Sequence, residues 1–524
     1  MRNEFIVFSI VSLVLVGVLS YFFNWAIWSL IILLPIIILG YYDFFQKKHA
    51  IMRNYPILGR GRYIMEELRP KIYQYFIEGE TDGAPISRMF RSVVYQRAKK
   101  VRDTTPFGTQ TNLYAEGYEW MNHSLNAKNV HEVNENPRVI IGGSDCTQAY
   151  SASIFNVSAM SFGSLSSNAI EALNGGAKIG GFAHNTGEGG LSPYHLKHGG
   201  DIIWQIGTGY FGCRKKEGGF SEELFQKNAS KESVKMIEIK LSQGAKPGHG
   251  GILPASKVTE EIAEIRNVPI GENVLSPPSH TAFNGFKGML HFIKKLRTLS
   301  GGKPIGIKLC IGVQSEFLAL CKEMIAEGIK PDFISVDGGE GGTGAAPLEF
   351  ANSMGMPYIE GLAFTHNALV GFGIREEIKI IASGKIINGF HMARAIALGA
   401  DACYSARAMM IALGCIQALE CNTNKCPTGV ATQDKELSAG LNVKDKKHRV
   451  ANYQKETIHA FLEMLAASGL KEPHQLNRTH IYRRISMSEI KRYDQLYKYI
   501  PNGSLLSKTH PEEFALHMSE IQVN

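Results

Sequence analysis

The sequence predicts an α/β protein: a (β/α)8 TIM-type barrel preceded by an N-terminal transmembrane helical hairpin. Eight short apolar runs alternate with amphipathic segments between residues 155 and 406, a pattern typical of strand–helix units that close into a barrel. Polar side chains follow most of these runs, and barrels carry their sites at the carboxyl ends of their strands. A doubly wound open sheet is the alternative, but no G-x-G-x-x-G turn opens the first unit.

Two uncharged segments open the chain, Phe5–Phe23 with 19 residues and Trp25–Tyr42 with 18. Each is close to the ~20 residues that cross a bilayer as a helix. A cleaved signal peptide is the alternative, but the apolar stretch is too long and no small-x-small site follows it. Arg2 precedes the first span, and Lys47 and Lys48 follow the second. The positive-inside bias therefore predicts a two-span protein of the cell membrane, with its catalytic domain in the cytoplasm.

The formal net charge of +8 is concentrated after the hairpin. Residues 47–102 contain 13 Lys or Arg and 5 Asp or Glu, a net of +8, so the remainder is balanced. A basic segment beside a membrane anchor indicates anionic lipid headgroups and not nucleic acid. A solvated face of ordinary helices is the alternative. We interpret residues 1–46 as the hairpin and 47–150 as a basic linker or cap.

The predicted barrel occupies residues 151–435, and a helical region at 436–524 is expected to wrap it. Its predicted strands are Phe155–Ser161, Gly181–Asn185, Met236–Ser242, Asn273–Ser276, Pro304–Cys310, Phe333–Asp337, Ile378–Ser383 and Asp401–Ala406. The clearest predicted helices are Lys257–Arg266, Phe286–Leu299, Ser315–Glu327 and Phe390–Leu398.

Glycine-rich turns at the last strands indicate a phosphate site. Gly384 and Gly389 follow the seventh strand, and Ser405 ends the eighth. A second loop, Glu340–Gly344, contributes Gly341 and Gly342. Lys308, on a central strand, would place a cation beside the negatively charged edge of a reduced flavin. A salt bridge in the barrel mouth is the alternative reading of Lys308.

Three cysteines follow the last strand at C-x5-C-x4-C: Cys415, Cys421 and Cys426. Thiolates bind soft metal centres, and three of them fit a three-iron, four-sulfide cluster. A structural zinc site or buried free thiols are the alternatives. The chain has eight cysteines with this single tight cluster, which indicates a reducing compartment and not a disulfide scaffold.

From about Ser158 to Gln433 the sequence resembles the flavin-binding barrel of glutamate synthase and the shorter stand-alone glutamate-synthase-like proteins of bacteria. The matching blocks are SAMSFGSLS, HNTGEGG, QGAKPGHGGILP, LSPPSH, EGGTGAAP and GCIQALECNTNKCPTGVATQ. The resemblance implies FMN and a [3Fe-4S] cluster, with the three cysteines as ligands. It also implies that Ser161, Gln243, Lys308, Gly384 and the turn near Ser405 build the FMN site. Glu188 and Lys246 match the family residues in the 2-oxoglutarate site.

The expected activity is that of an oxidoreductase acting on CH–NH2 donors, which makes L-glutamate from 2-oxoglutarate and ammonia. Lys246 would hold a substrate carboxylate, and Glu188 would handle protons or steady the iminium charge. Ferredoxin or a separate NADPH-oxidising subunit is expected as the electron donor, because no pyridine-nucleotide fingerprint occurs.

Two departures from the family bear on the substrate and the ammonia source. No cysteine precedes Cys146, so glutamine-derived ammonia would need a separate amidotransferase subunit. The family has GEGGQ after the lysine–proline pair, whereas this chain has His249 and Ile252 in place of the acid and the amide. The Ile252 side chain cannot donate a hydrogen bond to the substrate. His249 and His280 are therefore the candidates to replace the missing amide. The alternatives are therefore another oxo or imino acid substrate with the same cofactors, or a non-catalytic membrane electron-transfer subunit.

Overall fold

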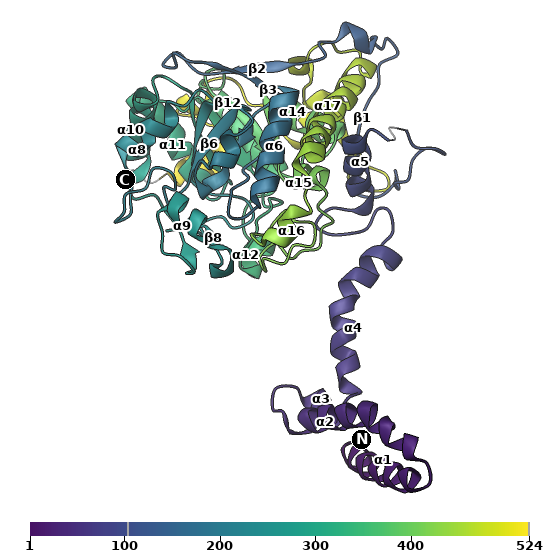
Figure 1. Cartoon of the computed structure of the whole chain (residues 1–524). Coiled ribbons are helices and arrows are strands. Elements are labelled where there is room, and N and C mark those ends of the chain that lie inside the picture. Colours follow the sequence, from purple (N-terminus) through teal and green to yellow (C-terminus); the bar gives the residue numbers. More distant parts are fainter. Residues whose placement is uncertain (102–103, 522–524) are drawn as a thin grey trace. The chain divides into compact units, whose positions relative to one another are not determined.

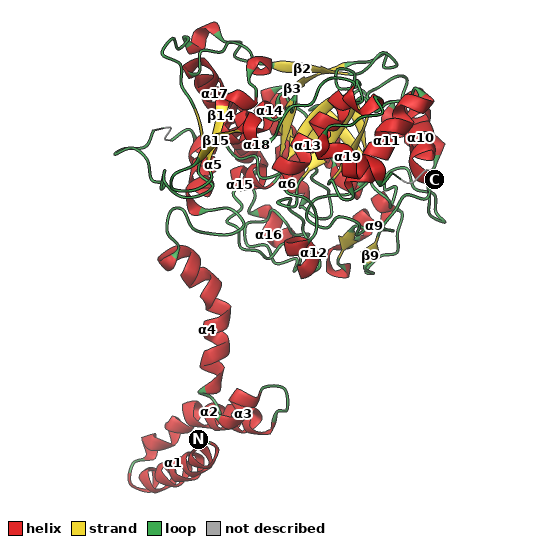
Figure 2. Cartoon of the chain, turned by 180° about the vertical axis from the view of Figure 1, so that it is seen from behind, coloured by secondary structure: helices red, strands yellow, loops and turns green. Residues whose placement is uncertain are grey.

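The computed structural model describes residues 1–101 and 104–521 of the chain. These residues form two compact units, Met1–Met89 and Phe90–Asn524. Figure 1 shows the elements of both along the sequence, and Figure 2 shows them by type.

The first unit is an α-helical hairpin followed by further helices. Its helices are α1 (Arg2–Phe22), α2 (Leu30–Phe45), α3 (Ala50–Asn54) and α4 (Gly59–Ile72), with a 3-10 segment at Asn24–Ser29 and a π turn at Tyr73–Ile77. Gly40 lets α1 approach α2, because a Cβ there would overlap the Phe5 ring. The segments Arg2–Phe22 and Asn24–Phe45 are long and apolar enough to cross a membrane.

The second unit contains a closed barrel of eight parallel strands, which confirms the predicted fold. Around the barrel the order is β4-β5-β6-β7-β10-β11-β12-β13, and β13 pairs with β4 to close it. The strands are β4 (Phe155–Val157), β5 (His184–Asn185), β6 (Ile202–Ile206), β7 (Val234–Lys240), β10 (Ile305–Leu309), β11 (Phe333–Asp337), β12 (Lys379–Ser383) and β13 (Ala402–Ser405).

One predicted barrel strand is wrong. Residues 273–276 contain β9 (Val274–Leu275), which pairs antiparallel with β8 (Ile252–Leu253) outside the barrel. The third barrel strand is instead β6, all five residues of which are buried. Leu275 is apolar but 69% exposed, so the apolar character of this run did not mean that it is buried in the barrel. Strand β6 was missed because it lies in a long glycine-rich stretch that resembles a loop.

Helices surround the barrel in Figures 1 and 2. They are α6 (Ser167–Gly180), α8 (Glu222–Ala229), α10 (Gly285–Leu299), α11 (Gln314–Glu327), α13 (Tyr358–Gly371), α14 (Gly389–Ala397), α15 (Arg407–Leu413) and α17 (Val443–Ala467). The other helices of this unit and its start are α5 (Arg88–Lys99), α7 (Pro193–Leu196), α9 (Glu260–Arg266), α12 (Leu348–Ser353), α16 (Lys435–Ala439), α18 (Tyr493–Leu496) and α19 (Glu512–Ser519). Helix α17 packs against α6, α14 and α15.

A two-stranded hairpin closes the amino-terminal end of the barrel. It consists of β2 (Arg138–Ile141) and β3 (Tyr150–Ser153). Ile141 and Tyr150 of the hairpin join Met236 and Phe333 of the barrel in one buried apolar cluster. The opposite end, near α9, β8 and α12 in Figure 1, carries the loops that follow the barrel strands.

The C-terminal region is not entirely helical. Strands β14 (Ile481–Arg484) and β15 (Ile490–Arg492) form a three-stranded antiparallel sheet with β1 (Glu119–Met121). This sheet ties the segment before the barrel to the segment after it.

Candidate active site

A largely buried ion pair lies at the carboxyl ends of β5 and β7, the two barrel strands that flank β6. Lys240 is the last residue of β7, and its Nζ lies 2.9 Å from Oε1 of Glu188 in the turn after β5. Gly207 and Gly251 line Glu188 closely, since a Cβ on either would lie 2.7 Å from a Glu188 side-chain atom. Burial opposes the ionisation of Glu188, but Lys240, followed by Lys246 and Arg266, lowers its pKa below the ordinary value.

The structure brings the predicted Lys246 to the same mouth. Its side chain is 3% exposed, and Nζ donates to the Ala345 carbonyl at 2.9 Å, in the loop after β11. Burial lowers the pKa of Lys246 to about 8, while Glu188 opposes the shift. Glu188 and Lys246 therefore belong to one electrostatic cluster.

Arg266 is a site residue that the sequence analysis missed. It ends α9 and is 4% exposed, with Nη2 donating to the Phe162 carbonyl at 2.9 Å and the guanidinium over the Phe211 ring. Its buried Nε has no hydrogen-bond partner among the described residues. Burial lowers the pKa of Arg266 to about 10, against the effect of Glu188. An arginine on a short amphipathic helix gave no signal that it would turn inward.

Lys308 lies on β10 and is paired. Its Nζ is 3.7 Å from Asp337 Oδ2, which also accepts a hydrogen bond from the Gly244 amide. The salt bridge considered as an alternative is thus present. Gln243, also predicted for the cofactor site, accepts a hydrogen bond from Lys240 Nζ at 2.5 Å.

Two further cations lie at the glycine-rich turns that the sequence analysis predicts to bind a phosphate. Arg407 begins α15 and donates to the Glu340 carbonyl, and a Cβ on Gly342 would lie 2.9 Å from its side chain. Lys385 follows Gly384, and burial together with Arg407 lowers the Lys385 pKa. Lys385 is exposed and Arg407 is half-buried. Two like charges beside glycine-rich turns favour an anion between them, so these residues fit a phosphate group.

The other predicted cofactor residues have internal roles in the described structure. A Cβ on Gly384 would lie 2.9 Å from Tyr358, and one on Gly389 would lie 2.6 Å from the Phe461 amide of α17. Gly389 is thus explained by helix packing. Ser405 Oγ donates to the Ile386 carbonyl at 2.7 Å. Gly341 donates its amide to the Gly338 carbonyl, and Ser161 Cβ lies against the turn that carries Glu188.

The three clustered cysteines are free thiols in one loop. In residues 1–101 and 104–521 no group of three or more His, Cys, Asp or Glu side chains is placed to hold a metal ion. The donor chemistry nevertheless fits a soft metal centre. Burial opposes the Cys426 thiolate, but hydrogen bonds from Thr428 and from the amides of 428, 430 and 431 outweigh it and lower the Cys426 pKa. The pKa of Cys415 is raised to about 12 and that of Cys421 is also raised, mainly by burial.

Lys257 is a second missed residue near this loop. It is 2% exposed, and Nζ donates to the carbonyls of Ser164 and Ala431 at 2.9 and 2.8 Å. Burial lowers its pKa to about 8, with Cys421 and Cys426 acting in the opposite direction. A buried ammonium therefore lies within electrostatic reach of two of the proposed thiolates.

The two candidate substrate histidines differ in their surroundings. His280 uses both ring nitrogens, at 2.9 Å from the Lys240 carbonyl and 3.1 Å from the Tyr210 hydroxyl. It therefore scaffolds the loop and has no nitrogen left for a substrate. His249 Nδ1 lies 2.9 Å from the Gly250 carbonyl, and Ile252 begins the β8–β9 hairpin.

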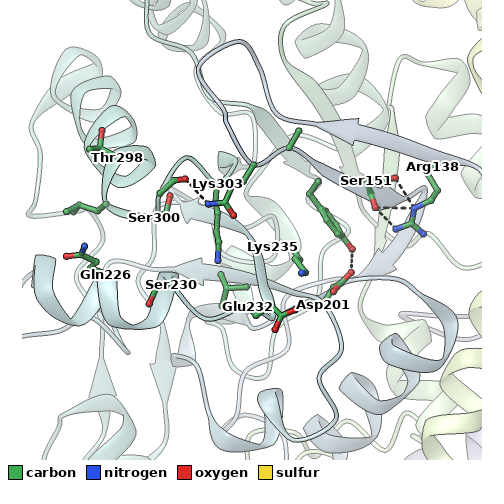
Figure 3. Close-up of a pocket in the computed structure, with 16 residues that line it drawn as sticks. Arg138, Ser151, Asp201, Gln226, Ser230, Glu232, Lys235, Thr298, Ser300 and Lys303 are labelled. Atoms are coloured by element: carbon green, nitrogen blue, oxygen red, sulfur yellow. Dashed lines mark hydrogen bonds between the residues drawn. The ribbon is translucent and has the colours of Figure 1, made fainter.

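A cavity of about 860 Å³ lies at the opposite, amino-terminal end of the barrel (Figure 3). Two of its polar side chains are engaged: Lys303 Nζ donates to the Ala229 and Lys231 carbonyls, and the Tyr150 hydroxyl donates to Asp201. This end carries none of the predicted site residues.

Known proteins share much of this chain. A sequence profile described as a conserved region in glutamate synthase matches residues 94–471. A "glutamate synthase large subunit-like protein YerD" of Bacillus subtilis is 38% identical over 508 residues, covering 89% of this chain and 96% of its own.

More distant matches cover less. An "archaeal glutamate synthase [NADPH]" of Methanocaldococcus jannaschii is 36% identical over 336 residues, 63% of this chain and 62% of its own length. Among solved structures, a double mutant of flavocytochrome b2 with pyruvate bound has a TM-score of 0.42 at 13% identity, covering 80% of this chain and 85% of its own. The strand order, and not this likeness, defines the fold.

Proposed function

The chain belongs to the glutamate synthase family, and from that premise we propose that it is an FMN- and iron–sulfur-dependent oxidoreductase that forms L-glutamate from 2-oxoglutarate and ammonia. The observation that carries the proposal is the charge balance at the barrel mouth. Three cations, Lys240, Lys246 and Arg266, surround the single carboxylate of Glu188. The surplus of two positive charges suits a dianionic substrate such as a 2-oxo dicarboxylic acid.

The four charged residues at the barrel mouth would have two kinds of role, substrate binding and proton transfer. Lys246 and Arg266 are the groups to hold the two carboxylates of the substrate, because each is a buried cation beside Glu188. Lys240 keeps Glu188 ionised, so a Glu188 oxygen can accept the proton that the nitrogen of ammonia gives up once it has added to the keto carbon. Bound FMN would supply hydride transfer, and an iron–sulfur cluster would supply electrons one at a time.

The FMN site would use the cations at the last strands. Lys385 and Arg407 would bind the phosphate, and Lys308 would face the flavin edge, with Asp337 Oδ2 at 3.7 Å as its counter-charge. Ser161, Gln243, Gly341, Gly342, Gly384 and Ser405 remain predicted contacts. Cys415, Cys421 and Cys426 would hold the cluster.

A second substrate is favoured by one residue. Ile252 stands where the family amide is expected, and an apolar side chain leaves a substrate oxygen without a partner at a cost of about 1–3 kcal/mol. A different oxo or imino acid with the same cofactors is therefore the second candidate.

Location and partners are also proposals. The hairpin of α1 and α2 would anchor the chain in the cell membrane. Ferredoxin or a separate NADPH-oxidising subunit would deliver electrons, and ammonia would come from solution or from a separate amidotransferase.

The decisive experiment is anaerobic reoxidation of the reduced holoenzyme. Adding 2-oxoglutarate with ammonia should restore the oxidised flavin spectrum and yield stoichiometric glutamate, whereas either compound alone should not. A flavin that stays reduced would reject this substrate, and a screen of other oxo acids would then test the second candidate.

A further inference from the structure

A fully buried carboxylate lies beneath the proposed site and contacts three other barrel strands. Glu238 of β7 is 0% exposed. Its Oε1 accepts hydrogen bonds from Asn185 Nδ2 of β5 at 2.8 Å and from Gln205 Nε2 of β6 at 2.6 Å. Its Oε2 accepts one from Ser335 Oγ of β11 at 2.5 Å. Burial and the nearby Glu238 also keep the pKa of Tyr404 on β13 well above its ordinary value.

The orientation of Asn185 follows from hydrogen-bond chemistry. Its Oδ1 accepts from the Gly187 amide at 3.0 Å, and a backbone amide can only donate. Nδ2 must therefore face Glu238, which must present an acceptor at that point. Gly187 begins the turn that carries Glu188, so the chain of contacts runs from Glu238 through Asn185 to Glu188.

We propose that Glu238 is a positioning residue, which orients Asn185 and so holds the turn bearing Glu188. Lys240 lies two residues further along β7 on the same face of the strand, and it pairs with Glu188 directly. One strand thus holds Glu188 by two routes, the ion pair and the amide relay. The relay needs an acceptor at Oε1 and not a negative charge, so glutamine should replace Glu238 while methionine should not.

Amide hydrogen exchange at Gly187 tests this relay without reference to catalysis. Without an acceptor at position 238, Asn185 is no longer held with its Oδ1 toward the Gly187 amide. Glu238→Met should therefore raise the Gly187 exchange rate about tenfold or more. Glu238→Gln should restore protection, and Ser335→Ala, which affects the other oxygen, is the matched control with unchanged exchange. Asn185→Leu removes the acceptor itself and should reproduce the loss if Glu238→Met does not fold.

The relay from Glu238 to Gly187 does not depend on the proposed function. Only the predicted effect of Glu238 variants on turnover rests on the proposed catalytic role of Glu188. Glu238→Met should then lower kcat more than it raises KM, with recovery in Glu238→Gln. Unchanged Gly187 exchange in Glu238→Met, or equal loss in both Glu238 variants, would overturn the relay. A wild type that forms no glutamate but shows the predicted exchange pattern would reject the proposed function and leave the relay standing.

A separate observation concerns α4, which follows the hairpin of α1 and α2 after the short helix α3. Asp43 of α2 accepts hydrogen bonds from Arg60 Nε and Nη2 at 2.7–3.0 Å and from the Ile57 amide at 3.1 Å. Helix α4 is therefore tied to the point where α2 would leave the bilayer.

One face of α4 is apolar and exposed within its unit. Ile64, Leu68 and Ile72 follow at intervals of four with Met65 beside them, and their exposed fractions run from 38 to 63%. Arg62 and Arg69 border this face on one side and Lys71, with Glu67 beyond it, on the other, whereas Glu66 lies opposite. Basic residues at the margins of an apolar face are typical of helices that lie in a membrane interface.

We infer that α4 lies in the interface of an anionic membrane, an inference that rests on the proposed hairpin anchor. The full-length protein, in vesicles containing phosphatidylglycerol, would carry a photo-crosslinking phenylalanine analogue at position 68 or, as the control, at position 66. Position 68 should form lipid adducts several-fold more than position 66. Equal adducts at both positions, or position 68 crosslinked to barrel peptides, would overturn the inference. Retention of the full chain on salt-washed vesicles reports the hairpin anchor independently.

Discussion

Substituting Gly207 by alanine tests whether Glu188 must sit where the structure places it. Gly207 follows β6, and a Cβ there would lie 2.7 Å from Glu188 Cβ. Carbon atoms pack at about 3.5–4.0 Å, so Glu188 must move by roughly 1 Å. A misplacement of ~1 Å in a catalytic group costs on the order of 100-fold in rate. Because the clash is at the root of the side chain, rotation of its end cannot relieve it.

The assay is kcat for glutamate formation, with flavin absorbance and thermal unfolding as checks on the fold. Gly312→Ala is the control, since Gly312 follows β10 at the same end of the barrel and a Cβ there has nothing within 4 Å. Gly207→Ala should lose roughly 100-fold in kcat with flavin retained, and Gly312→Ala should match the wild type. A Gly207→Ala enzyme with wild-type kcat would refute the reasoning that Glu188 is positioned for catalysis.

Four further predictions concern the cluster, pH, the substrate and the membrane. Cys421→Ser should lower bound iron and abolish the low-field signal of an oxidised three-iron centre, whereas full iron occupancy would reject the ligand assignment. Since burial lowers the Lys246 pKa to about 8, the lysine loses its charge as pH rises through that value. KM for 2-oxoglutarate should therefore rise above pH 8, and Lys246→Met should remove this dependence; a pH-independent wild type would contradict the role. Ile252→Gln should raise kcat/KM for 2-oxoglutarate by about tenfold, or ~1.4 kcal/mol, if the missing amide limits binding, and no gain would show that the amide is not needed. Deleting Met1–Tyr42 should release a flavin-containing protein whose residual vesicle binding weakens with salt, so salt-insensitive binding would count against the basic segment.

The sequence determined the fold class, the family and the order of the loops. Alternating apolar runs and helices, as at Ile378–Ser383 and Phe390–Leu398, are local patterns, and the barrel follows from their repetition. The motif that contains Glu188 and the loop that contains Lys246 could likewise be located from residue order alone. The error at residues 273–276 has the same origin, because a short apolar run looks alike in a barrel strand and in an exposed hairpin.

Only the tertiary structure decided which side chains meet. Lys240 and Glu188 are 52 positions apart, and their 2.9 Å ion pair depends on the register of β5, β6 and β7. Arg266 turns inward over Phe211, and His280 spends both nitrogens on the loop scaffold. These contacts depend on packing between segments far apart in the sequence, and the hydrophobic periodicity of a single helix or strand does not predict them. Sequence patterns report how a segment relates to its own neighbours along the chain, whereas the charge balance of a site is set by segments that closure of the barrel brings together.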